Sequence, residues 1–267
     1  MKRICILFYL FACAATNLIA KDITEEEYIK ADKILWDNYE ELQSKIWERM
    51  DIYPEERDSL IAMYKKASES THKRNVELAI EYASVPSGLK RVFMVRNNIG
   101  KPKLIEIYQT LPDSLKTSPY GSLLKEYIDT DQLKVGDPYV PFECYLPDST
   151  LYDWSDVKNG KILLIYSGLG CMGPEGREII KQWTQAGWTI LDFQVVDNFD
   201  KFQETAQLYN LGNINVADFK GEASPMKILY SAQAAPTCYL IEDGIIKIIS
   251  IGLSEEIIDA MGVKFDF

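Results

Sequence analysis

The sequence predicts an α/β protein in two parts, with a helical first part followed by a mixed sheet flanked by helices. Three observations predict it. Apolar residues recur at helical spacing as far as about residue 130. Beyond 135–138 (Val-Gly-Asp-Pro), apolar runs typical of buried strands alternate with helical stretches. Finally, the pair Asp243-Gly244 separates two apolar runs, which is the signal of a β-hairpin.

The first part, residues 21–134, is predicted as a small bundle of short helices. Thr24 followed by Glu27 fits a capping box that begins the first helix. Pro54 with two acidic residues after it marks a second start, which leads into apolar residues up to Ala67. Proline and glycine then separate further helical stretches at 76–82, 89–96, 104–108 and 122–128.

The second part, residues 135–267, is predicted as one α/β domain. The expected strands are 162–166, 189–196, 237–241 and 245–251. The expected helices are 174–183, 199–209, 225–231 and 255–261. Two strand–helix units followed by a hairpin give a sheet that contains both parallel and antiparallel neighbours.

The N-terminus has the features of a secretory signal peptide, residues 1–20. Lys2 and Arg3 precede a short apolar stretch, and Ala20 stands before a charged junction. A lipoprotein signal that ends before Cys13 is the alternative, since 10–13 reads Leu-Phe-Ala-Cys, and a lipid on Cys13 would tether the protein to a membrane. Either reading predicts export to the periplasm or cell envelope.

Composition excludes several classes of function. The net charge of −11 is spread along the chain, which argues against a nucleic-acid-binding protein. The single histidine, His72, and the lack of a cysteine pair predict neither a metal site nor a haem or other cofactor. Asp192 and the acidic residues after it lack the glycine of a calcium loop, so no ion site is expected there.

The cysteines point to the most informative segment. Cys5 and Cys13 belong to the expected signal, which leaves Cys144, Cys171 and Cys238. An odd number leaves one thiol unpaired within an exported chain. Cys171 lies between a buried strand and a helix, and a cysteine at a helix N-terminus favours the thiolate. Cys171 is therefore the candidate nucleophile.

Three segments of the second part carry a resemblance to a known family. They are Val135-Gly136-Asp137-Pro138, Lys161 to Tyr166 leading into Cys171, and Ala235-Pro236-Thr237 followed by Cys238 to Ile241 and Asp243-Gly244. Together they resemble the thioredoxin-like family, in particular envelope thiol–disulfide oxidoreductases of the TlpA/ResA type. The resemblance covers 135–267, and the helical part is similar to the region preceding such domains in Bacteroidetes envelope proteins. It implies a thioredoxin-like fold, a cis proline facing the redox cysteine, and substrate binding at this proline and its neighbours.

The chain departs from the family at its active segment, Trp-Cys-x-x-Cys. If Cys171 is the first cysteine, the second is replaced by Pro174, which leaves a degenerate motif with one thiol. Matching Gly173-Pro174 to the central Gly-Pro of the family would instead place Met172 and Glu175 at the cysteine positions. The strand position at which many thioredoxins carry a buried acid is held by Ile165.

Charges and a further cysteine near this motif would modify its chemistry. Glu175 in the first helical turn would oppose a thiolate on Cys171, and Arg177 would offset it. Cys238 lies two residues beyond Pro236 and so faces the same side of its strand. Cys238 is either a thiol that lies deeper in the core on the side of Cys171, or a small buried residue of a central strand.

Three functions remain open on these residues. The first is thiol–disulfide exchange by Cys171 alone, with protein thiols or disulfides as partners. The second is a thioredoxin-fold protein that binds a peptide without catalysis. The third is a peroxidase-like use of Cys171, for which Arg177 is the candidate activating arginine.

Overall fold

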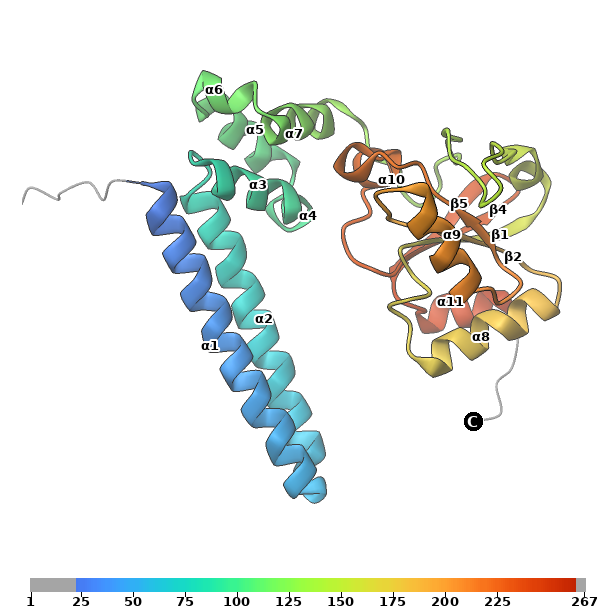
Figure 1. Ribbon diagram of the computed structural model, residues 1–267, viewed down its shortest axis with the longest axis horizontal. Helices are drawn as coiled ribbons and strands as arrows, with labels where there is room; N and C mark the ends of the chain where they lie inside the picture. Colours follow the sequence, from blue (N-terminus) through green and yellow to red (C-terminus); the bar gives the residue numbers. More distant parts are fainter. Residues whose placement is uncertain (1–22, 263–267) are drawn as a thin grey trace, which may run out of the picture.

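The computed structural model describes residues 23–262, so the expected signal sequence with Cys5 and Cys13 lies outside the described residues. A helical part and an α/β part follow one another along the chain, as predicted (Figure 1). Among residues 23–262, no helix combines the length and the apolar character that crossing a membrane requires.

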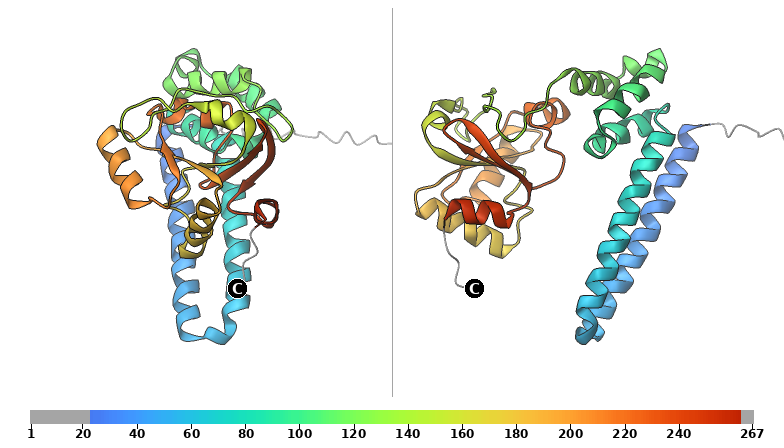
Figure 2. Two further views of the ribbon diagram at one scale, coloured as in Figure 1. Left: turned by 90° about the vertical axis from the view of Figure 1, so that its right-hand side faces the viewer. Right: turned by 180° about the vertical axis from the view of Figure 1, so that it is seen from behind.

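Two long helices, α1 (Glu25–Ile52) and α2 (Arg57–Glu81), form a hairpin that projects away from the rest of the chain (Figures 1 and 2). The predicted cap is confirmed, because the Thr24 side chain accepts a hydrogen bond from the N–H of Glu27. The prediction of separate short helices here is wrong, since α2 continues through the polar stretch 68–75. That stretch has no proline or glycine to break the helix, and α1 supports it along its length.

Five shorter helices pack around a second core next to the base of the hairpin. Leu89, Val92, Phe93, Leu104 and Leu124 are at most 1% exposed in this core. The helices are α3 (Pro86–Met94), α4 (Arg96–Ile99), α5 (Lys101–Thr110), α6 (Asp113–Lys116) and α7 (Pro119–Asp129).

The second part is built on a five-stranded mixed sheet with the order β3-β2-β1-β4-β5. Strands β1, β2 and β3 are parallel, whereas β4 runs antiparallel to β1 and to β5. The mixed α/β class predicted from the sequence is confirmed. The strands are β1 (Lys161–Tyr166), β2 (Thr189–Phe193), β3 (Ile214–Val216), β4 (Thr237–Glu242) and β5 (Ile245–Ile251).

Helices cover both faces of this sheet, and successive residues of each strand point to opposite faces. Residues of α8 and α11 pack with Leu163, Ile165 and Cys238 on one face. Residues of η2 and α10 pack with Ile162, Leu164 and others on the opposite face. The helices of this part are α8 (Pro174–Gln185), α9 (Phe199–Leu208), α10 (Pro225–Ile228), α11 (Glu255–Met261), and the 3-10 turns η2 (Trp154–Asn159) and η3 (Gly221–Ala223). A further 3-10 turn, η1 (Pro54–Glu56), connects α1 to α2 in the helical part.

Two local details agree with the sequence and one does not. The turn between β4 and β5 has positive φ at both Asp243 (48°) and Gly244 (76°), as a tight hairpin requires. The Ala235–Pro236 peptide bond is cis, as the resemblance implied. Strand β3 was not predicted, because three residues are too few to show an alternating pattern.

A buried arginine joins the helical part to the α/β part. Arg96 is 2% exposed, and its Nη2 donates to the carbonyl oxygens of Lys227 (2.7 Å) and Ala232 (3.4 Å) across the junction. Its Nη1 donates to the carbonyl of Phe93, and the guanidinium lies 4.4 Å and 4.9 Å from the ring centroids of Phe93 and Tyr127. The arginine therefore gives hydrogen bonds to both parts while it packs between two rings.

We predict that Arg96→Ala lowers the free energy of unfolding by about 3 kcal/mol, because buried carbonyls lose their donor and a cavity opens beside Phe93. Urea unfolding followed by circular dichroism measures the change. Arg74→Ala is the control: Arg74 lies on the exposed side of α2, paired with Glu77, and its loss should cost under about 1 kcal/mol. Equal losses in the two variants would contradict the prediction.

Candidate functional site

The loop that carries Cys171 leaves the central strand β1 through a sharp turn. Ser167 has a φ of 48°, and its N–H donates to the carbonyl of Phe193 at 2.7 Å. A Cβ on Gly168 would lie 2.0 Å from Cγ2 of Ile165, so only glycine lets the loop lie this close to the sheet. The N–H groups of Cys171 and Met172 both donate to the carbonyl of Gly168 at 3.0 Å, which closes the turn.

Cys171 does not occupy the helix N-terminus that the sequence led us to expect. Helix α8 begins at Pro174, with Gly173 as its N-cap, so Cys171 lies three residues before the first helical residue. Proline suits the first helical position because it needs no N–H partner there. The side chain of Cys171 is exposed, whereas that of Met172 is buried among apolar residues of the sheet and α8.

Cys171 lines a pocket of about 270 Å³ together with the end of β2 and one face of α9. Lys201, Thr205 and Tyr209 reach this pocket at a spacing of four residues, and Gln194 and Asp197 complete its polar lining. None of these five residues was predicted from the sequence as part of the site. The i, i+4, i+8 spacing of Lys201, Thr205 and Tyr209 is the signal that would have placed these three on one helix face.

The cis proline and its neighbours lie near the same loop but outside this pocket. A Cβ on Gly168 would be 3.3 Å from Cβ of Pro236, so the proline packs on the start of the loop. Ala235 is exposed, and Thr237 is buried with its hydroxyl donating to the carbonyl of Ala234 at 2.6 Å. The lining residues of the Cys171 pocket include none of the three.

The two charged residues predicted beside the thiol both lie outside its pocket. Glu175 is exposed in the first turn of α8. Arg177 donates from Nη1 to the carbonyl of Met172, so its guanidinium binds the backbone of the loop. Neither lines the pocket of Cys171, whose basic residue is Lys201.

The other two described cysteines are buried and free. Burial raises the pKa of Cys144 to about 12, with a further contribution from the charge of Asp218. Burial likewise raises the pKa of Cys238 to about 12, with Asp192 adding to it. Both therefore stay protonated at neutral pH, which leaves Cys171 as the exposed thiol among residues 23–262.

A buried acid lies beneath the loop, on a strand other than the one expected. Asp192 of β2 is 0% exposed and faces Ile165 of β1 in the parallel register. Burial raises its pKa to about 7, although the N–H groups of Gly168 and Leu169 and the amide of Gln194 counteract this in part. From the sequence, Asp192 was considered only as an ion ligand, and the position of the buried acid was assigned to Ile165. The acid comes instead from β2, the strand next to β1. The position of Asp192 inside the apolar run 190–193 was the signal from which its burial could have been predicted.

A chain of hydrogen bonds continues from Asp192 towards the edge of the sheet. Nε2 of Gln194 donates to Asp192 and to Oδ1 of Asn215, the latter at 3.2 Å. Nδ2 of Asn213 donates to the same oxygen at 3.1 Å. Gln194 thus connects the pocket of Cys171 with amides on β3 and the preceding turn.

The described part of the chain contains no group of three histidine, cysteine or acidic residues arranged to hold a metal ion. The reactive groups that line the pocket are the thiol of Cys171, the amine of Lys201 and the hydroxyl groups of Thr205 and Tyr209.

Comparison with known proteins gives similarity to solved structures only. No protein-family model and no curated protein matches the chain. A thiol-disulfide oxidoreductase from Bacteroides fragilis is 17% identical, with a TM-score of 0.40 over 46% of this chain and 96% of that one. The thioredoxin domain of a thiol-disulfide oxidoreductase from Bacteroides vulgatus is 12% identical, with a TM-score of 0.42 over 48% and 96%. A thiol peroxidase from Chromobacterium violaceum is 9% identical, with a TM-score of 0.37 over 46% and 78%.

The raised pKa of Asp192 predicts that the free energy of unfolding decreases as the pH rises from about 4 to about 7. In this window the folded protein holds a proton that the unfolded chain, with an ordinary carboxyl, has released. The decrease from this group is at most about 1.4 kcal/mol per pH unit, and it levels off above pH 7.

Urea unfolding of the wild type and Asp192→Asn across this pH range measures the effect. The substitution should remove this part of the slope, because asparagine does not titrate. Identical pH dependence in the two proteins would show that Asp192 has an ordinary pKa in the folded state.

Proposed function

We propose that the α/β part exchanges thiol and disulfide groups with a protein or peptide through a single cysteine, Cys171. The observation that carries this proposal is the contrast among the described thiols: Cys171 is exposed in a polar pocket, and the other two are buried. Pro174 stands where a resolving cysteine would be needed, so the exchange has to be completed by another molecule.

The reaction proceeds in two displacements. The thiolate of Cys171 attacks one sulfur of a substrate disulfide; a new disulfide forms between them, and the other substrate sulfur leaves as a thiolate. An external thiol, as its thiolate, then attacks the substrate sulfur of this mixed disulfide. A disulfide forms between the external thiol and the substrate, and Cys171 is released as a thiolate.

Pocket chemistry supports a polar substrate segment beside the reacting sulfur. Lys201 and Asp197 offer one charge of each sign, and Thr205 and Tyr209 offer hydroxyl groups. In this proposal Pro236, packed on Gly168 at the start of the loop, shapes the backbone that the substrate meets, with Ala235 and Thr237 on either side of it.

A second candidate is a binding protein of the same fold without thiol chemistry. The start of α8 favours it, because Gly173 and Pro174 occupy the N-cap and first turn, with Met172 and Glu175 on either side. With the motif aligned in this way, no cysteine flanks the Gly-Pro pair. The loop and the cis-proline segment would then bind a peptide.

For location, we propose export to the periplasm or cell envelope on the basis of residues 1–20. Cleavage after Ala20 would remove Cys13 together with the signal, whereas processing before Cys13 would leave a lipid on that cysteine. Metabolic labelling with a radioactive fatty acid distinguishes the two outcomes.

We predict that the wild type forms a mixed disulfide with a peptide disulfide, that Cys171→Ser forms none, and that Cys238→Ser retains it. Intact-mass spectrometry and peptide mapping identify the modified cysteine. Cys238 is the matched control because it is a thiol of the same domain that is fully buried. If the wild type and Cys171→Ser behave alike, the exchange proposal is wrong and thiol-independent binding is the better account.

A further inference from the structure

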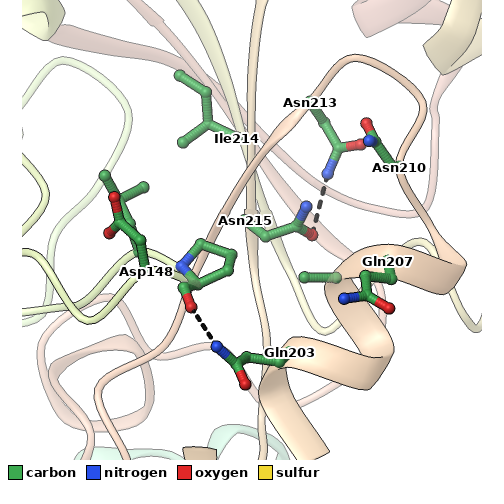
Figure 3. Close-up of a pocket in the computed structure, with 10 residues that line it drawn as sticks. Asp148, Gln203, Gln207, Asn210, Asn213, Ile214 and Asn215 are labelled. Carbon is green, nitrogen blue, oxygen red and sulfur yellow. Dashed lines mark hydrogen bonds between the residues drawn. The ribbon is translucent and has the colours of Figure 1, made fainter.

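A second and larger pocket lies at the β3 edge of the sheet, between α9 and the segment 146–148 (Figure 3). Its volume is about 600 Å³, within the range of small-molecule sites. Side-chain amides dominate its lining. They belong to Gln203, Gln207, Asn210, Asn213 and Asn215.

The pocket exists because pairing at the sheet edge stops early. Tyr145 and Ala217 exchange two backbone hydrogen bonds, of 2.8 Å and 3.1 Å. Two residues further along this antiparallel pair, Pro147 falls opposite Asn215 and has no N–H to donate. The edge of β3 is left open there, and α9 places Gln203 and Gln207 one turn apart above it.

Several polar atoms of these amides have no hydrogen-bond partner among residues 23–262. Nε2 of Gln203 donates to the carbonyl of Pro147, and Oδ1 of Asn210 accepts from the N–H of Gly212. Oδ1 of Asn215 accepts from two neighbouring amides. The unpartnered atoms are Oε1 of Gln203, both polar atoms of Gln207, Nδ2 of Asn210 and Nδ2 of Asn215.

The chemistry of the lining restricts the class of ligand. None of the ten lining residues is basic, so an anion would find no positive charge. The one acidic residue, Asp148, already accepts hydrogen bonds from the N–H (3.0 Å) and hydroxyl (2.6 Å) of Thr150 through Oδ1. Donors and acceptors are mixed, which suits ligand groups that both donate and accept, such as hydroxyls.

The arrangement favours a hydroxylated ring over an extended peptide. A peptide added to a sheet edge binds through backbone groups, and Ala217, two residues beyond Asn215, is already paired with Tyr145. The pocket instead offers side-chain amides around its sides. Leu146, Pro147 and Ile214 add apolar surface on which the C–H face of a sugar ring can pack.

We propose that this amide pocket binds a neutral saccharide of one or two rings. The proposal rests on the pocket alone and is independent of the chemistry of Cys171.

The test uses the full chain with three probes, maltose, cellobiose and lactose, and an uncharged, end-capped tetrapeptide for comparison. Saturation-transfer NMR detects binding and titration calorimetry measures affinity. We expect at least one disaccharide to bind and Gln207→Leu to weaken it about tenfold, through lost hydrogen bonds. Gln109→Leu is the matched control, because Gln109 is an exposed residue of α5 away from the pocket, and it should leave the affinity unchanged.

Gln207 is exposed and makes no hydrogen bond within the described chain, so its replacement should leave the melting temperature unchanged. Absence of binding by all three sugars would overturn the proposal. Sugar binding that Gln207→Leu leaves unaltered would also overturn it, because the sugar would then lie elsewhere. Binding of the tetrapeptide alone would assign the pocket to peptides instead.

Discussion

The guanidinium of Arg96 is the interaction on which the arrangement of the two parts depends. It is almost completely buried, and burial lowers its pKa from the ordinary value. Three carbonyl oxygens and two aromatic rings replace the water it has lost. Ile228 of α10 packs into the core of the helical part beside it, so the apolar core is continuous across the junction.

This junction also determines where the cis-proline segment lies. Asn97 follows Arg96 and donates from Nδ2 to the carbonyl of Ser231, while its N–H donates to the side chain of Gln233. Residues 231–233 lead directly into the cis Ala235–Pro236 bond beside the thiol loop. The helical part therefore holds the segment that leads into the cis bond, and Pro236 itself packs on the start of the thiol loop at Gly168.

The sequence predicted elements whose signals are local and missed features that depend on contacts between distant residues. The hairpin at Asp243-Gly244 follows from the backbone angles of two residues, and the central strand β1 from one apolar run. The pocket of Cys171 could not be predicted in the same way, because Lys201 and Tyr209 meet the thiol only after α9 packs beside the loop. For Asp192 the apolar run 190–193 is a local signal of burial, whereas its hydrogen bonds with the N–H groups of Gly168 and Leu169 join residues distant in sequence.

The edge that Pro147 leaves open has a consequence beyond the pocket beside it. An edge strand presents unpaired backbone groups to any other extended chain, and long, flat edges promote association between molecules. Here β3 has three residues, and the bridge between Tyr145 and Ala217 lies just beyond its last residue, while Leu151 pairs back with Tyr145. A second molecule therefore finds too short a strand for continuous pairing. The shortness of β3, and not Pro147, limits association through the edge that the proline leaves open.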